Sequence, residues 1–195
     1  MSLEFKTVQT PGNYIVSDIG TVVSKVREKW ISADSTLITA DSSNLTADGA
    51  SAPYYMYGHK LEVANRLLKK NQKFQKYPLV FLAMDFPEVK EAGILKCTLN
   101  IGLIEFTKKE YNAQDRYTNV FEPVLYPLYR KFLDELFKSD FFWDGKDDQQ
   151  VPPHTKIDRP FWGTEGQQKN DKYIFNDALD CIELVGLKLN QSIKN

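Results

Sequence analysis

This 195-residue chain has few histidines and cysteines, a net charge close to zero and no long apolar run. Each of these features argues against a class of protein. Two histidines cannot supply a histidine-rich metal site, and two cysteines, Cys97 and Cys181, cannot build a disulfide framework. Lys and Arg number 25 against 26 Asp and Glu, which argues against nucleic-acid binding by bulk electrostatics but leaves a local basic patch open. No apolar run reaches the roughly 20 residues of a membrane helix, and the first six residues have no signal-peptide core. We therefore expect a soluble intracellular protein with reduced thiols and no membrane partner.

The composition that is present predicts one globular domain over residues 1–195, because 42% of residues are hydrophobic and 26% are charged. Residues 1–16 mix apolar and turn residues and are predicted to form an N-terminal arm. Residues 32–53 are rich in Ser, Thr, Ala and Asp, which favours a projecting hairpin or a long polar loop. Residues 139–170 are rich in Asp, Gly, Pro and Gln with aromatic anchors, and are predicted to form a long irregular connection.

Apolar residues at steps of three and four predict two helices in the first half of the chain. Ser17 and Asp18 offer N-caps to the first, whose apolar positions are Ile19, Val22, Val23, Val26 and Trp30. The second covers roughly residues 59–71, and the residues expected on its buried side are Leu61, Ala64, Leu67 and Leu68.

A third helical region begins near Asn112 and continues with helical spacing to Phe137. Pro123 and Pro127 lie inside this pattern, and each removes a backbone donor. The helix is therefore expected to be kinked, or to break and restart near Pro123. Residues 128–137 are expected to be helical in either case.

Three segments have the patterns of strands. Residues 79–84 are continuously apolar, which suits a central strand, and residues 95–103 alternate as in a long strand with one wet face. Residues 86–93 are about the length of a hairpin loop, so these two strands are expected to be antiparallel neighbours. Residues 178–190 alternate as a last strand, bulged near Gly186. This order predicts an α+β fold, with an antiparallel or mixed sheet packed against helices.

Motifs for nucleotide, dinucleotide, zinc and serine-hydrolase sites are missing from the sequence. Cys97 and Cys181 fit buried small hydrophobes better than nucleophiles. His154 and Asp158 have the spacing of an orienting pair for a general base. We favour a loop whose charges tie it to the sheet edge or to a neighbouring subunit, because no nucleophile or phosphate loop accompanies the pair. The sequence therefore assigns no catalytic residue and no cofactor.

Two oppositely charged segments are candidates for a subunit or partner interface. Residues 59–76 carry six basic residues and one acid, and residues 140–148 form an acidic turn. Three aspartates of that turn have oxygens that suit a hard cation, but their spacing does not match an EF-hand loop, so we assign no metal site. Two tyrosines before the basic segment have faces that stack on bases, or that pack under a loop. The candidate interface residues are Lys60, Arg66, Lys69, Lys70, Lys73, Asp144, Asp147, Asp148, Tyr54 and Tyr55.

Several short motifs follow one another in an order that resembles a known family. They are Tyr57-Gly58-His59-Lys60-Leu61-Glu62, Lys76-Tyr77-Pro78-Leu79-Val80, Arg116 through Phe121, Leu125-Tyr126-Pro127-Leu128-Tyr129, His154-Thr155-Lys156-Ile157-Asp158-Arg159, Trp162-Gly163 and Asn176-Asp177. The chain resembles, over about residues 57–190, a family of small structural proteins from tailed phages and prophages of gut bacteria, including crAss-like phages. The order of elements is also similar to tail-terminator and tail-completion proteins, which assemble as rings between head connector and tail.

The resemblance implies a tail-terminator-like fold and a non-enzymatic virion protein at the head–tail junction. Such a protein forms a homo-oligomeric ring of six or twelve copies and contacts neck, portal or tail proteins, with DNA in the central channel as a further candidate partner. It implies no catalysis and no cofactor, and a location in the host cytoplasm during assembly and then in the virion neck or tail. Segments 32–53 and 139–170 depart from compact terminators. Two alternatives stay open: a small cytoplasmic enzyme using His154 and Asp158, and an adaptor that contacts DNA through residues 59–76.

Overall fold

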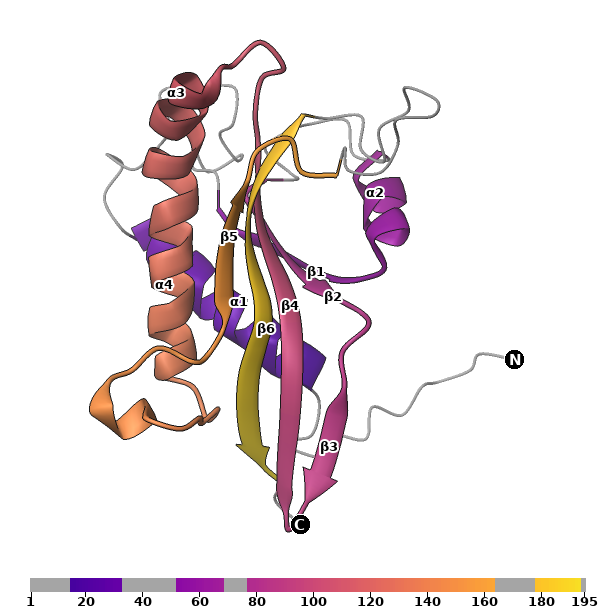
Figure 1. The fold of residues 1–195 in the computed structure, drawn as a ribbon, viewed down its shortest axis with the longest axis vertical. Coiled ribbons are helices and arrows are strands. Elements are labelled where there is room, and N and C mark those ends of the chain that lie inside the picture. Colours follow the sequence, from indigo (N-terminus) through magenta and orange to yellow (C-terminus); the bar gives the residue numbers. More distant parts are fainter. Residues whose placement is uncertain (1–14, 33–51, 69–76, 164–177, 194–195) are drawn as a thin grey trace.

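The computed structural model describes residues 15–32, 52–68, 77–163 and 178–193. These residues form a six-stranded mixed sheet packed against helices, which confirms the α+β prediction (Figure 1). The strands are β1 (Tyr54–Gly58), β2 (Leu79–Ala83), β3 (Glu88–Glu91), β4 (Ile94–Phe106), β5 (Thr155–Arg159) and β6 (Leu179–Ser192). The helical elements are α1 (Ile15–Ser32), α2 (Lys60–Leu68), α3 (Ala113–Arg116), the π-helix η4 (Tyr117–Leu125), α4 (Tyr126–Phe137) and the 3₁₀ turn η5 (Lys146–Asp148).

The sheet has the strand order β1-β2-β4-β6-β5, with β3 paired to β4 off this path. Helices α1 and α4 pack on one face and α2 packs on the other (Figure 1). Side chains therefore alternate between two apolar clusters: Leu103 belongs to the cluster under α1 and α4, and Ile104 belongs to the cluster under α2. A sheet buried on both faces in this way accounts for the continuous apolar run of β2.

The one strand pairing that the sequence predicts is confirmed. Strands β2 and β4 are antiparallel, and the first half of β4 has one wet face, where Lys96 and Asn100 are exposed between buried neighbours. The predicted bulge lies where the β4–β6 register shifts, opposite Leu99 and Ile101. Gly186 occupies the left-handed region there at φ 68°, and its N–H donates to the Asn100 side-chain oxygen at 3.0 Å.

Two details of the first helices were predicted wrongly. Helix α1 begins at Ile15, so Ser17 and Asp18 lie inside its first turn and are not N-caps. In α2 the described buried face is Val63 and Ala64, while Leu61 is 54% exposed. A residue two positions from Val63 points about 200° away around a helix, so Leu61 faces solvent once Val63 packs on the sheet. The side chains of residues 65–68 and segment 69–76 lie outside the described residues.

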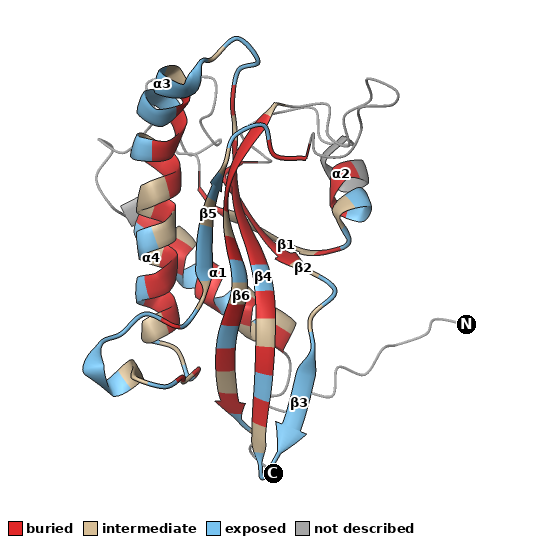
Figure 2. Cartoon of the chain, viewed as in Figure 1, coloured by how far each residue is buried: buried red, intermediate tan, exposed pale blue. Residues whose placement is uncertain are grey.

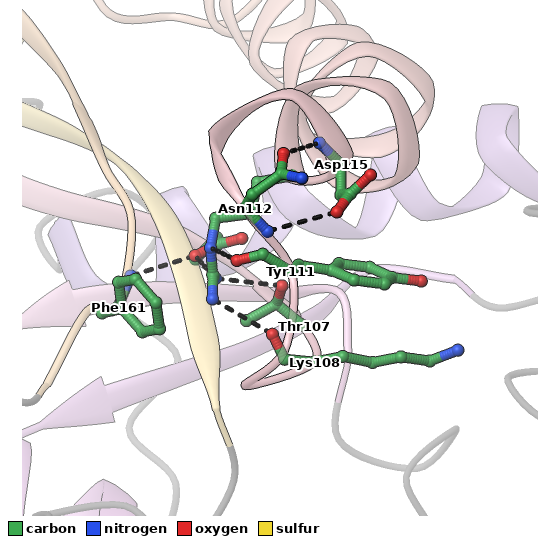
Figure 3. A network of polar contacts seen from close by, with 8 residues as sticks. Thr107, Lys108, Tyr111, Asn112, Asp115 and Phe161 are labelled. Carbon is green, nitrogen blue, oxygen red and sulfur yellow. Dashed lines mark hydrogen bonds and ion pairs between the residues drawn. The ribbon is translucent and has the colours of Figure 1, made fainter.

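The third helical region neither breaks nor restarts at Pro123. Asn112 caps it through a reciprocal capping box with Asp115, as Figure 3 shows. The chain then runs through η4, which contains Pro123, directly into α4. The wider π turns accommodate Pro123, which lacks a backbone donor, and Pro127 follows at the junction where the π turns pass into α4.

Three short strands were missed by the sequence patterns. Strand β1 comes from the tyrosine-rich run before the basic segment, where no strand was predicted, and it pairs in parallel with β2. Strand β3 lies within the expected loop 86–93, and β5 lies within the expected irregular segment 139–170. Each of the three pairs with one strand only and is mostly half-buried or exposed. The alternation of apolar and polar residues that marks a half-buried strand is therefore weak in each. Most of segment 32–53 and of the arm 1–16 lies outside the described residues.

Candidate subunit interface

The His154 and Asp158 segment is fastened to α4 by two tyrosines. His154 Nε2 lies 2.9 Å from the Tyr129 hydroxyl, and its Nδ1 lies 2.6 Å from the Pro152 carbonyl oxygen. The Tyr126 hydroxyl donates to Asp158 at 3.0 Å. A carbonyl only accepts, so Nδ1 carries a proton and donates it to Pro152, and Nε2 shares a hydrogen bond with the Tyr129 hydroxyl. His154 and Asp158 therefore bind separate tyrosines. The sequence analysis expected this segment to be a loop, but residues 155–159 form the edge strand β5.

These two contacts, Tyr126 with Asp158 and Tyr129 with His154, form a clamp between α4 and β5, and a cation and burial reinforce it. Lys156 pairs with Asp158 and lies 4.8 Å from the Tyr126 ring centroid and 5.7 Å from that of Tyr129. Burial, followed by the Asp158 carboxylate, raises the pKa of Tyr126 to about 12, and the same two causes raise the pKa of Tyr129. Both hydroxyls are therefore neutral hydrogen-bonding groups at physiological pH.

An apolar groove of about 600 Å³ lies beside this clamp, between α4 and the segment 149–152. Its apolar lining is Tyr129, Leu133, Phe137, Val151 and Pro152. Arg130, Asp134 and Lys138 add charges from α4. Val151 is 59% exposed, so apolar surface is presented to solvent here.

The far wall of the groove is held by hydrogen bonds from aromatic and basic side chains. The Trp143 indole N–H donates to the Gln150 carbonyl at 3.0 Å, and Lys146 donates to the Ser139 carbonyl at 2.8 Å and to that of Phe141. Burial lowers the pKa of Lys146, whose ammonium also lies 5.1 Å from the Trp143 ring centroid. The groove is therefore a built feature of the fold.

The acidic turn of the sequence analysis directly precedes, in the chain, the segment that lines this groove. Asp144, Asp147 and Asp148 are exposed around η5, and Gln149, the next residue, lines the groove. The acidic segment and the segment that lines the groove are therefore neighbours in the chain, but the sequence alone did not reveal the groove, because α4 and residues 149–152 meet only in the folded structure.

The basic segment is described only at its start. Lys60 lies 4.6 Å from the ring centroid of Trp162, so its ammonium is held against an aromatic face of the same subunit. The backbone of Arg66 belongs to α2, but its side chain lies outside the described residues, as do Lys69, Lys70 and Lys73.

The two candidate tyrosines of β1 make contacts within the subunit. The Tyr55 hydroxyl donates to the Val16 carbonyl of α1 at 2.8 Å, and burial raises its pKa. The Arg27 guanidinium lies 4.9 Å from the Tyr54 ring centroid. Both rings are half-buried and contact α1 of the same subunit, so they pack inside the subunit, against a helix and not under the loop that the sequence analysis offered.

A buried ion pair that the sequence patterns missed joins α3 to β6. Arg116 Nη1 donates to Asp180 at 2.6 Å and to the Thr107 hydroxyl at 3.1 Å. The same guanidinium donates to the carbonyls of Lys108 and Tyr111 at 3.0 and 3.1 Å. Figure 3 shows these groups of the turn after β4 converging on one cluster.

The Phe161 backbone closes this cluster from the other side. Its N–H donates to Asp180 at 3.0 Å, and the Arg116 guanidinium lies 3.6 Å from its ring centroid (Figure 3). Glu105 lies directly across the ladder from Asp180 and is also buried. Burial raises the pKa of Glu105 to about 8, although its carboxylate accepts a hydrogen bond from the Phe106 N–H. The register between β4 and β6 sets these two acidic residues opposite each other in the sheet.

Both cysteines are buried, as expected for small hydrophobic residues, and burial raises the pKa of Cys97 to about 12. Among the described ranges, no His, Cys, Asp and Glu side chains gather in a group of three around a metal-sized space. The helices of the described part are too short or too polar to cross a bilayer. Comparison with family models, curated proteins and solved structures found no significant match.

Proposed function

We propose that this protein is a structural subunit of a tailed-phage virion and forms a homo-oligomeric ring at the head–tail junction. In that place, as neck, connector or tail terminator, the ring joins the capsid and portal to the tail. The proposal rests on the resemblance of residues 57–190 to such proteins, on the α+β fold, and above all on the exposed apolar groove along α4.

The groove carries the proposal because its chemistry is that of a protein contact. Aromatic and aliphatic side chains form its floor, and charges of both signs lie along its rims. Protein interfaces combine an apolar, aromatic-rich centre with a polar rim in this way. Small-molecule sites instead converge a few buried polar groups on one ligand. Here the Tyr129 hydroxyl already binds His154, and the charged side chains of the lining, Arg130, Asp134 and Lys138, all come from the surface of α4.

Light scattering of the purified chain, with negative-stain images of the same sample, tests this function. The expected result is closed rings with six or twelve times the 22.5 kDa subunit mass. Mass spectrometry of particles from a phage that encodes the chain then tests its place, and the protein is expected in intact virions. A protein that is monomeric at every concentration and missing from virions would contradict the proposal.

A further inference from the structure

A small cavity lies on the side of the sheet that carries α2. It has a volume of about 260 Å³ and is lined by residues of β2, β4 and β6, by Lys60 of α2 and by Trp162. Figure 2 shows β4 continuously buried in its upper part and alternating between buried and exposed residues in its lower part. The cavity lies at this boundary, because its lining includes Gly102 from the buried part and the exposed Asn100.

A glycine makes this cavity. In the strand register Gly102 lies between Phe81 of β2 and Glu183 of β6, so the three residues form a row across one face of the sheet. Strands β2 and β6 flank β4 and lie about 10 Å apart, and a side chain at position 102 would occupy the space between them. Even a Cβ there would lie 3.3 Å from Cys181 Sγ. The floor of the row is therefore bare backbone, which allows another group to approach the sheet closely.

The walls of the cavity are apolar and held in place. Phe81 and Trp162 are each 2% exposed, and their rings pack edge to face with centroids 6.2 Å apart. The Trp162 indole N–H donates to Glu183 at 2.7 Å, which fixes the orientation of the indole ring. Ala83 and Val185 continue the walls along β2 and β6. The cavity is smaller than the sites of drug-sized ligands, about 300–1,000 Å³, and suits a flat apolar group the size of one amino-acid side chain.

The polar groups around the cavity favour an anion. Glu183 already has its charge balanced, because its carboxylate pairs with Arg159 and also accepts from the Trp162 indole. The Lys60 ammonium lies 4.6 Å from the Trp162 ring centroid and forms no ion pair with any described residue. The amide nitrogen of Asn100 likewise donates to no residue of the described part. One positive charge and an amide donor therefore remain, and they suit a ligand that supplies a negative charge and hydrogen-bond acceptors.

We propose that this cavity binds a carboxylate that carries a small, flat apolar group. The apolar group lies on the Gly102 backbone between β2 and β6, and the carboxylate pairs with the Lys60 ammonium. Two sources have this chemistry: a free carboxylic acid, and the C-terminal residue of a polypeptide. The inference stands apart from the proposed ring function, because the whole cavity belongs to one subunit.

Ligand-detected NMR on the full-length chain tests this binding with two probes of the same shape. Phenylacetate carries the carboxylate, and phenylacetamide replaces it with a neutral amide. Phenylacetate is expected to bind at least about tenfold more tightly, because only the carboxylate makes a charge-assisted contact with Lys60. N-acetylphenylalanine ends in a carboxylate as a polypeptide does. Tighter binding of this probe than of phenylacetate indicates a C-terminal residue as the ligand, and weaker binding indicates a free acid.

Two variants test the two parts of the site. Lys60→Met removes the ammonium and keeps an apolar stem, so it is expected to reduce the affinity for phenylacetate about tenfold and to leave that for phenylacetamide unchanged. Gly102→Ala puts a methyl group on the floor and is expected to weaken both probes. Lys90→Met is the matched control, since Lys90 is an exposed lysine of β3 outside the lining, and it is expected to bind both probes as the wild-type protein does.

Thermal melting followed by circular dichroism checks that each variant folds, and Lys60→Met decides alone if Gly102→Ala does not. The proposal is overturned if phenylacetate does not bind, if both probes bind equally, if Lys60→Met binds phenylacetate as the wild-type protein does, or if Lys90→Met loses binding. A chain that binds phenylacetate and forms no rings would contradict the ring function and leave this site standing, so the two failures are distinguishable.

Discussion

The buried pair of Arg116 and Asp180 makes a quantitative test of how this fold is held together. Asp180 is fully buried and Arg116 is 2% exposed, so replacing Asp180 with Ala leaves a guanidinium charge without its counter-ion away from water. The change also removes the acceptor of the Phe161 N–H. Hydrogen bonds to Thr107 and two carbonyls remain, but they do not neutralise the charge.

The expected loss from Asp180→Ala is about 3–5 kcal/mol of unfolding free energy, the usual result of breaking a buried ion pair on one side. Urea unfolding followed by tryptophan fluorescence measures it, with all variants at one protein concentration because assembly itself adds stability. The double variant Arg116→Met with Asp180→Leu is expected to recover part of the loss, since it removes both buried charges.

Glu91→Ala is the matched control for this measurement. Glu91 pairs with Lys96 on the surface, where both side chains are at least half exposed, and such pairs contribute little. Its unfolding midpoint is expected to stay close to that of the wild-type protein. If Asp180→Ala were as mild as Glu91→Ala, the reasoning about the buried pair would be refuted.

Three further predictions concern the carboxyl opposite this pair, the clamp and the bulge. The pKa of Glu105, about 8, lies above its ordinary value of 4.5, so the folded state holds more protons and stability falls as pH rises from about 4.5 to about 8. Glu105→Gln is expected to remove up to a few kcal/mol of that fall, seen in urea unfolding at pH 5 and pH 8, and an unchanged slope would contradict the burial argument. Tyr129→Phe deletes the hydroxyl that meets His154 and is expected to cost about 1 kcal/mol, with the exposed Tyr117→Phe as a neutral control in thermal melts. Gly186→Ala meets no atom within 4 Å, so its expected cost of about 1–2 kcal/mol is conformational strain alone; Gly186→Asn is expected to cost less, and equal costs would refute this reason.

Long periodic segments were the ones that sequence reasoning placed correctly. The apolar steps of α1, the run of β2 and the alternation of β4 each extend over enough residues to specify a buried face. The capping box at Asn112 and the bulge at Gly186 also carry local signals, because a side-chain cap and a left-handed glycine are properties of a few adjacent residues.

The candidate interface was only partly accessible in this way. The acidic turn was found from its composition, but the groove beside it was not, because α4 and segment 149–152 meet only in the folded chain. A signal for these contacts was present: Tyr126 and Tyr129 share one helix face, and their partners His154 and Asp158 lie an even number of residues apart, so an extended chain presents them on one side. The segment lacked an apolar alternation, so it was assigned to a loop.

The sequence by itself determined the α+β class, the central strands, the main helices and the burial of both cysteines, since each depends on hydrophobic periodicity within one segment. The tertiary structure alone decided the edge strands, the pairing of Arg116 with Asp180 and the groove between α4 and residues 149–152. Edge strands and buried ion pairs depend on which distant segment lies alongside, and strand order and register set that neighbour, which no local pattern encodes.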